Sequence, residues 1–275
     1  MICAWDALLG ILPPWLREDV DRIGRETMQE LRLRMHSPPE IVLNFQSIFL
    51  KRAVEAEDIS FTVNTASRYS PWTAASVSKG YITSPGGHRI GLCGEVVCKE
   101  GTVTGIREVT SLNIRVARDF PGIGSQVLSA KGSVLILGPP GWGKTTLLRD
   151  MIRQLSTCSC VAVVDERGEL FPDGMSRGKR MDVLTGAPKY QGIDMVLRSM
   201  GPQWIALDEI TASEDCDAIV QAHGCGVRLI ASAHSGSQEE FCRRTVYKSL
   251  VHHGIFETVY IMCPDKTFRT ERMVR

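Results

Sequence analysis

Eight residues near the middle of the chain read Gly138-Pro139-Pro140-Gly141-Trp142-Gly143-Lys144-Thr145, which fits the pattern G-x-x-x-x-G-K-[ST]. A short apolar run at 133–137 precedes this loop, and apolar residues recur at helical spacing over 144–155 after it. A strand, a glycine loop and a helix in this order aim backbone N–H groups and a helix N-terminus at phosphate groups. The stretch therefore predicts a nucleotide-phosphate site, because a chance glycine-rich turn would not need both flanks.

The residue types within the loop predict a division of roles. Glycines let the backbone wrap closely around phosphates, Lys144 brings a mobile positive charge, and the Thr145 hydroxyl can ligate Mg²⁺. We therefore expect ATP and Mg²⁺ as cofactors. The expected nucleotide-binding residues are Gly138, Pro139, Pro140, Gly141, Trp142, Gly143, Lys144, Thr145 and Thr146. Trp142 is unusual in such a loop, and the sequence leaves open whether it packs beside the nucleotide or against a neighbouring subunit.

Composition sets broad limits on the function. The chain has 275 residues, and its 43% hydrophobic content is enough for one large or two modest globular domains. A net charge of +1 makes no bulk electrostatic case for nucleic acid or a membrane surface as partner. Nine cysteines without a C-x-x-C pair argue against zinc-ribbon and thioredoxin-like sites and favour a reducing cytosol. No run approaches the roughly 18 apolar residues of a membrane span, so any membrane association is expected to be peripheral.

A proline and two glycines interrupt the patterned sequence at 119–125 and predict a domain boundary there. Upstream, helical spacing over 15–30 and 58–72 accompanies segments of strand-like alternation, so residues 1–120 are expected to form a smaller α+β domain. The strands expected there cover 31–34, 41–43, 48–50, 89–98, 102–106 and 112–116.

Downstream, over 121–275, short apolar runs alternate with helical segments. The runs lie at 133–137, 161–164, 205–207, 227–232 and 259–262. Such an alternation predicts an α/β fold, a parallel sheet with helices on both faces. Ligands bind at the carboxyl ends of the strands in such sheets, so polar groups that directly follow the runs are expected to line the site.

Two acids follow the apolar strand 204–207. We expect Asp208 to hold the magnesium and Glu209 to polarise the attacking water, as in a Walker B element. A solvated pair of acids at a strand end is the alternative. Neighbouring strand residues point to opposite sides, so two acids here can do different work only where the backbone turns.

Two further strand ends carry polar groups. Asp165 and Glu166 follow the run 161–164; Glu166 is a candidate for the catalytic water or the metal's second shell, and a turn-forming or capping role stays open. His234 follows the run 227–232, where a polar group can sense the γ-phosphate, although a lone histidine can equally be structural.

Four elements, in their order along the chain, resemble those of the secretion and pilus-assembly ATPases, the traffic ATPases of type II and type IV systems. They are the glycine loop, the acids at 165–166, the acids at 208–209 and His234. The segment 195–210 is similar to that family's arginine-containing helix and Walker B strand, and His234 falls where its histidine box lies. Upstream, the segments 30–34, 86–96 and 111–118 are similar to a sporulation ATPase family of endospore-forming bacteria.

The resemblance implies a RecA-like ATPase domain and a homohexameric ring whose subunit interfaces hold the nucleotide. It implies that arginines of the N-terminal domain reach the nucleotide, with Arg107, Arg115 and Arg118 as candidates and surface salt bridges as the alternative. Many traffic ATPases have glycine where this chain has Asp208, so magnesium binding here is expected to be more direct.

The same resemblance implies a cytoplasmic location on the mother-cell side of a sporulation channel complex. The expected partners are an integral membrane platform and other proteins of that complex, which would hold the chain peripherally at the membrane. No nucleic acid is expected. The second hypothesis is nevertheless a nucleic-acid-dependent P-loop ATPase, whose basic face would comprise Arg32, Arg34, Arg89 and Arg107. A small-molecule kinase is a third, but no arginine-rich lid appears near the loop.

Overall fold

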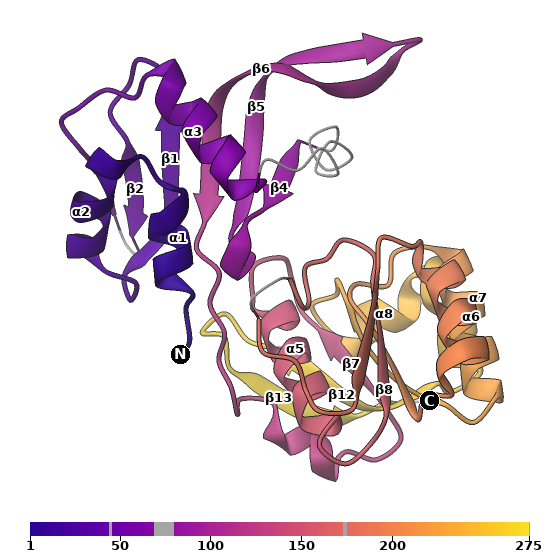
Figure 1. The fold of residues 1–275 in the computed structure, drawn as a ribbon. Coiled ribbons are helices and arrows are strands. Elements are labelled where there is room, and N and C mark those ends of the chain that lie inside the picture. The colour runs from indigo at the N-terminus through magenta and orange to yellow at the C-terminus, as the bar shows by residue number, and fades with distance from the viewer. Residues whose placement is uncertain (44–45, 69–79, 173–174, 275) are drawn as a thin grey trace. The chain divides into compact units, whose positions relative to one another are not determined.

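The computed structural model describes residues 1–43, 46–68, 80–172 and 175–274 (Figure 1). The chain divides into two compact units, each with its own sheet. The first comprises Met1–Asp119 and Pro172–Met175, and the second comprises Phe120–Phe171 and Ser176–Arg275. Among the described residues, no helix is both long enough and apolar enough to cross a membrane.

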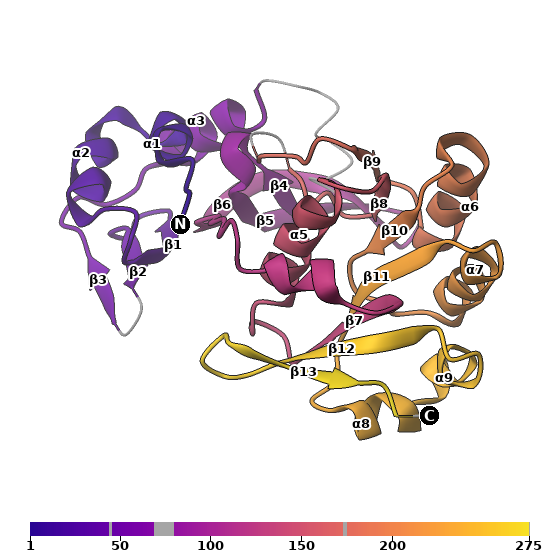
Figure 2. The ribbon, with the colours of Figure 1, turned by 90° about the horizontal axis from the view of Figure 1, so that it is seen from below.

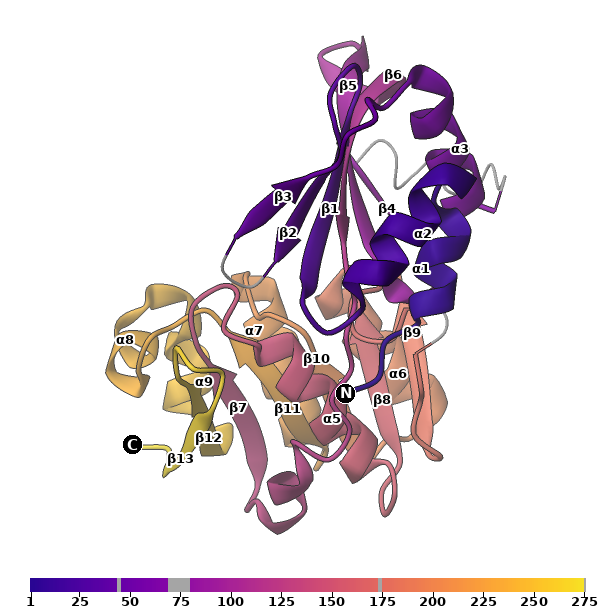
Figure 3. The same cartoon turned by 90° about the vertical axis from the view of Figure 1, so that its left-hand side faces the viewer.

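The first unit contains a six-stranded antiparallel sheet in the order β3-β2-β1-β6-β5-β4. Helices lie on one face of this sheet (Figure 3), and the buried Leu31 and Leu33 of β1 belong to the core beneath them. The alternating Arg32 and Arg34 lie on the other face. The strands are β1 (Met28–Arg34), β2 (Glu40–Leu43), β3 (Ser47–Phe49), β4 (Tyr81–Thr83), β5 (Arg89–Lys99) and β6 (Thr102–Arg115), and the helices are α1 (Trp5–Ile11), α2 (Pro14–Ile23) and α3 (Ala56–Ala66).

Three expectations for this unit need correction. The helix predicted over 15–30 ends at Ile23, because Gly24 takes a φ of +83° and the chain turns into β1. The strands predicted at 102–106 and 112–116 are parts of the single strand β6. The helix predicted over 58–72 is α3, which ends at Ala66, and positions 69–72 lie outside the described residues.

The second unit contains a seven-stranded sheet in the order β13-β12-β7-β11-β10-β8-β9. All neighbouring strands from β12 to β9 are parallel, and β13 is antiparallel to β12. The strands are β7 (Ser133–Leu137), β8 (Val161–Asp165), β9 (Met181–Thr185), β10 (Trp204–Leu207), β11 (Arg228–Ala233), β12 (Phe256–Met262) and β13 (Phe268–Arg272), and the helices are α5 (Lys144–Leu155), α6 (Lys189–Met200), α7 (Ser213–Gly224), α8 (Gln238–Arg243) and α9 (Lys248–His252).

Helices cover both faces of this second sheet (Figure 2). In β7, Val134 and Ile136 belong to the core that includes Met151 of α5. Leu135 belongs to a second core, which includes Ile219 of α7. A central strand that is buried on both faces explains the unbroken apolar run of β7. The predicted α/β fold is therefore confirmed, and the edge strands β9 and β13 are additions to it.

Candidate nucleotide-binding site

The glycine loop joins β7 to α5 within the second unit. Gly141 and Gly143 have φ values of +78° and +95°, in the left-handed region where side chains are strained. A Cβ built on Gly138 would lie 2.8 Å from the Cβ of Met262, so glycine is needed there for close packing. A Cβ on Gly141 would meet no atom within 4 Å, which leaves that side of the loop open for a ligand.

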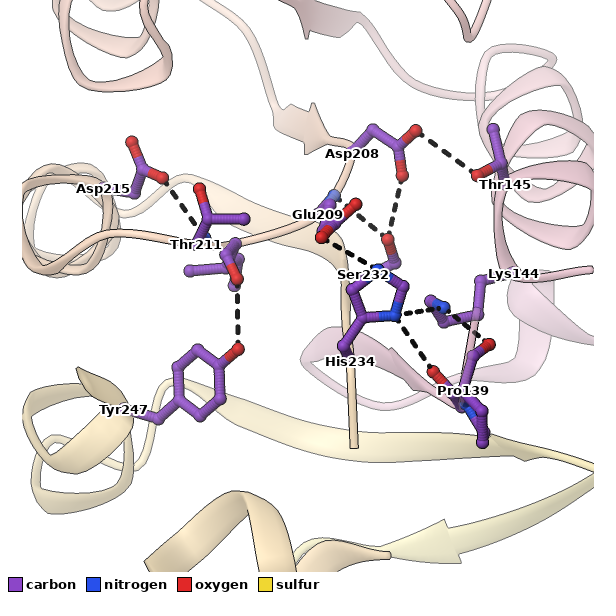
Figure 4. Close-up of polar contacts among 12 residues, drawn as sticks. Pro139, Lys144, Thr145, Asp208, Glu209, Thr211, Asp215, Ser232, His234 and Tyr247 are labelled. Carbon is purple, nitrogen blue, oxygen red and sulfur yellow. Dashed lines mark hydrogen bonds and ion pairs between the residues drawn. The ribbon is translucent and has the colours of Figure 1, made fainter. Parts of the chain in front are cut away.

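Lys144 begins α5 and turns its side chain back into the loop (Figure 4). Its Nζ donates to the carbonyl oxygen of Pro139 at 3.0 Å and lies 2.8 Å from Nδ1 of His234. Burial lowers the pKa of Lys144, and the carboxylates of Glu209 and Asp208 oppose that shift. A buried ammonium inside an open glycine loop fits a phosphate group.

Asp208 directly follows β10 and faces the start of α5. Its Oδ2 accepts a hydrogen bond from the Thr145 hydroxyl at 3.3 Å, and its Oδ1 accepts one from Ser232 of β11 at 2.9 Å. Burial raises the pKa of Asp208, and the Ser232 hydrogen bond lowers it. The facing hydroxyl and carboxylate are oxygen ligands of the kind that Mg²⁺ prefers. Ser232 was not among the predicted residues, although it lies in the run before His234.

Glu209 takes a left-handed φ of +42°, so the backbone turns between the two acids. Its N–H donates to the Ser232 hydroxyl at 3.0 Å, and its Oε1 lies 2.8 Å from Nε2 of His234. Because Nδ1 of His234 accepts from the Lys144 ammonium, the geometry assigns the imidazole hydrogen to Nε2, which donates to Glu209. His234 therefore bridges the loop lysine and the second Walker B acid (Figure 4).

The two acids at the end of β8 have different surroundings. Asp165 is buried, and its carboxylate accepts from the backbone N–H groups of Glu169, Leu170 and Phe171 at 2.9, 2.8 and 3.2 Å. Asp165 thus builds the turn after the strand. Glu166 instead pairs with Lys189 of α6, with 2.6 Å between Nζ and Oε2.

A small cavity brings the two strand ends together. Its lining residues are Asp165, Glu166, Arg167, Lys189, Asp208 and Glu209. Both pairs of acids thus face one space, as the shared carboxyl edge of the parallel sheet requires. Lys189 was missed by sequence reasoning, because a single lysine at a helix start forms no motif.

Trp142 is half-buried and packs against the core cluster that includes Tyr260 and Met262. Its indole therefore contacts the same domain that carries the loop. Of the other predicted loop residues, Pro140 is exposed and Thr146 is half-buried.

Two of the arginine candidates for the nucleotide are held within the first unit. Arg115 Nε lies 3.7 Å from Oε1 of Glu30. Arg118 donates to the backbone carbonyls of Arg25, at 2.9 Å, and Met28. A contact between either arginine and the nucleotide stays a prediction.

The basic face expected for a nucleic-acid-dependent enzyme is largely ion-paired. Arg32 pairs with Glu30 and Arg34 with Glu40, each at 2.8 Å. The other two arginines of that face also have partners: Arg107 lies 3.1 Å from Glu95, and the Arg89 guanidinium stacks over Tyr81. Paired arginines attract phosphates less strongly than free ones, which weakens this alternative.

A family model described as "Sporulation stage III, protein AA" matches residues 10–270. The chain belongs to this family. The stage III sporulation protein AA of Bacillus subtilis (strain 168) is 36% identical over 269 residues, which cover 90% of this chain and 87% of that protein. The similarity to a sporulation family that the N-terminal segments predicted is confirmed.

Solved structures extend the likeness to the fold of traffic ATPases. The pilus retraction motor PilT, solved with bound ADP, superposes with a TM-score of 0.62 at 13% identity, covering 95% of this chain and 78% of that one. The Legionella pneumophila ATPase DotB superposes with a TM-score of 0.56 at 16% identity, covering 89% and 76%. This member of the sporulation stage III protein AA family therefore has the RecA-like fold of those proteins.

Proposed function

We propose that the chain is a Mg²⁺-dependent ATPase that hydrolyses ATP to ADP and phosphate. The observation that carries the proposal is the meeting of two sequence-distant elements in the second unit. The start of α5 brings Lys144 and Thr145 to the end of β10, where Asp208 and Glu209 lie. A phosphate-binding lysine, a metal-ligand pair and a carboxylate for the water are the parts that P-loop hydrolysis requires.

Each residue has a defined task in this proposal. Thr145 and Asp208 would hold Mg²⁺, which when bound supplies neutralising charge at the β- and γ-phosphates. Glu209 would orient and polarise the attacking water, with Glu166 as the second candidate base.

His234 gives this site a means to sense its ligand. The Lys144 ammonium presently donates to the Pro139 carbonyl and to Nδ1 of His234. When a phosphate accepts from Lys144 instead, His234 loses that donor, and the hydrogen bond from its Nε2 to Glu209 is free to rearrange. His234 would thus report phosphate occupancy to Glu209.

We further propose that the ATPase serves a sporulation channel of the secretion type, as a homohexameric ring. Membership of the sporulation family and the fold of traffic ATPases support this role. The proposed arrangement has a domain division at 1–120 and 121–275, with Arg115 and Arg118 acting on the nucleotide. In this arrangement the chain lies on the cytoplasmic, mother-cell side, and its partner is an integral membrane platform.

The test is ATP turnover by the purified chain together with its mass in solution, measured with and without ATP and Mg²⁺. We expect Mg²⁺-dependent release of phosphate that Lys144→Ala abolishes, and a rise to a hexameric mass with ATP. A strictly monomeric protein with full turnover would contradict the ring. Stimulation of turnover by DNA or RNA would instead favour the nucleic-acid-dependent alternative.

A further inference from the structure

Lys189 is a buried lysine that has no task in the proposed ATPase mechanism. It is the first residue of α6, and its side chain is only 6% exposed. Its Nζ lies 2.6 Å from Oε2 of Glu166, whose side chain is 39% exposed. Lysines are rarely buried unless they are paired, and the Glu166 carboxylate is the partner that permits the burial of Lys189.

The surroundings of Glu166 show what the pairing opposes. Glu166 lines the same cavity as three other acids, Asp165, Asp208 and Glu209. Each of those has local donors: backbone N–H groups for Asp165, hydroxyl groups for Asp208, and an imidazole for Glu209. Like charges gathered in a partly enclosed space repel one another, so a cation that pairs with Glu166 offsets its repulsion from the three other acids.

Tight packing of α6 on β8 fixes the ion pair. Gly192, one turn after Lys189, lies so close to Val164 that a Cβ would come within 2.4 Å of its Cγ1. Val164 is two residues before Glu166 on the same chain segment. The helix start and the strand end are therefore held at one separation, and the lysine reaches the carboxylate from a rigid element rather than a loop.

We infer that Lys189 is a positioning residue for hydrolysis, which holds the Glu166 carboxylate in the wall of the cavity beside Asp208 and Glu209. The inference rests on the proposed ATPase function. Without the ammonium, repulsion from the neighbouring acids turns the Glu166 carboxylate towards solvent, which removes it from the reacting centre. Lys144 serves the phosphates, so the loss of Lys189 lowers turnover and leaves nucleotide binding intact.

The primary test compares Lys189→Met with Lys189→Arg in steady-state ATP hydrolysis and in binding of a fluorescent ATP analogue. We expect kcat to fall roughly 10- to 100-fold in the methionine variant, the range seen when a residue that orients a site ligand is lost. KM and analogue affinity are expected to stay within about twofold of the wild type, because uniform binding is unchanged. The arginine variant should recover most of the turnover, since it keeps the charge.

Lys248→Met is the matched control, because Lys248 is also the first residue of a helix in the second unit but is exposed. It should behave as the wild type. If Lys189→Met does not fold, Lys189→Gln takes its place in the comparison, because glutamine is uncharged, polar and as long as methionine.

A double-mutant cycle with Glu166→Gln shows whether Lys189 acts through Glu166. We expect Lys189→Met/Glu166→Gln to be no slower than Glu166→Gln alone. Wild-type turnover in a folded Lys189→Met protein, or effects that simply multiply in the double variant, would overturn the inference and leave the ATPase proposal standing. A wild-type chain that binds ATP without hydrolysing it would overturn both.

Discussion

The ends of β8 and β10 carry the same dipeptide, Asp-Glu, and use it in opposite ways. At the end of β8, the carboxylate of Asp165 accepts hydrogen bonds from three backbone N–H groups, and the following glutamate is paired with a lysine. After β10, Asp208 accepts from two hydroxyl groups, and the following glutamate contacts a histidine. One aspartate builds a turn, and the other is available to a metal.

The difference comes from what each strand end meets. The chain after β8 curls back so that its own N–H groups reach the Asp165 carboxylate, which then has little capacity left for a ligand. The chain after β10 turns at Glu209 with a left-handed φ, so Asp208 faces α5 and β11 instead. Identical sequence at equivalent places in a sheet therefore does not imply identical chemistry.

The strongest contrast is expected between the two glutamates. Glu209→Gln should lower kcat roughly 100- to 1000-fold and trap bound ATP, because an amide cannot polarise the water as a base does. Glu166→Gln should lower kcat less, roughly 10- to 100-fold, because we expect Glu166 to orient groups at the metal rather than to polarise the water itself. Single-turnover hydrolysis with labelled ATP measures both. Normal turnover in Glu209→Gln would transfer the role of base to Glu166 and reverse the comparison.

For the aspartates, the larger effect is expected at β8 rather than β10, and it should appear in the free energy of unfolding. Asp165→Ala leaves two buried N–H groups and one partly buried N–H group without their acceptor, so we expect the free energy of unfolding to fall by about 3 kcal/mol. Asp208→Ala removes no such set of backbone partners and should change it by about 1 kcal/mol or less. Urea unfolding without nucleotide or Mg²⁺ distinguishes them. Equal losses in the two variants would mean that Asp208 also has a structural role.

Sequence reasoning could locate the strand ends because buried parallel strands leave unbroken apolar runs. The bounds of β7 and α5 match the predicted 133–137 and 144–155, and the acids at 208–209 follow directly from the strand before them. It favoured Asp208 and Glu209 over Asp165 and Glu166, but it left a turn-forming role for the second pair open, because that role depends on how the chain folds after β8.

The missed partners share one physical cause. Ser232 reaches the site because β11 lies beside β10 in the sheet, and Lys189 reaches it because α6 packs on β8. The order of strands in a sheet is not the order in the sequence, so a serine or lysine far along the chain carries no local signal. The overlong helix at 15–30 failed for a local reason instead, because Gly24 ends α2 before its apolar spacing does.

The packing of α6 on β8 can be changed without replacing a charged residue. Gly192→Ala would place a methyl within 2.4 Å of Val164, push α6 from β8 and loosen the Lys189–Glu166 pair. We expect a loss of about 1–3 kcal/mol in stability from overpacking and a several-fold lower kcat. Val164→Ala in the same chain should restore part of both.

Gly224 is the control for that substitution, because it is also a helix residue but a Cβ there would meet nothing within 4 Å. Gly224→Ala should be neutral or slightly stabilising. If Gly192→Ala loses stability but keeps full turnover, the spacing of α6 and β8 does not govern hydrolysis.

The smallest change in stability is expected for Asp208→Asn, and the sign of this change should depend on whether Mg²⁺ is bound. Burial raises the pKa of Asp208, so its ionised form is less stable in the folded protein than in the unfolded chain. Without Mg²⁺, Asp208→Asn should therefore stabilise the fold by about 1 kcal/mol or less at neutral pH. The gain should shrink as the pH falls through the raised folded pKa and vanish below the unfolded value, where both states are protonated. With Mg²⁺ and ATP the wild type should instead be more stable than Asp208→Asn, because only the wild type offers the metal a carboxylate ligand. Thermal unfolding at several pH values, with and without EDTA, reads both signs, and a stabilised asparagine variant that still gains fully from Mg²⁺ would remove Asp208 from the metal site.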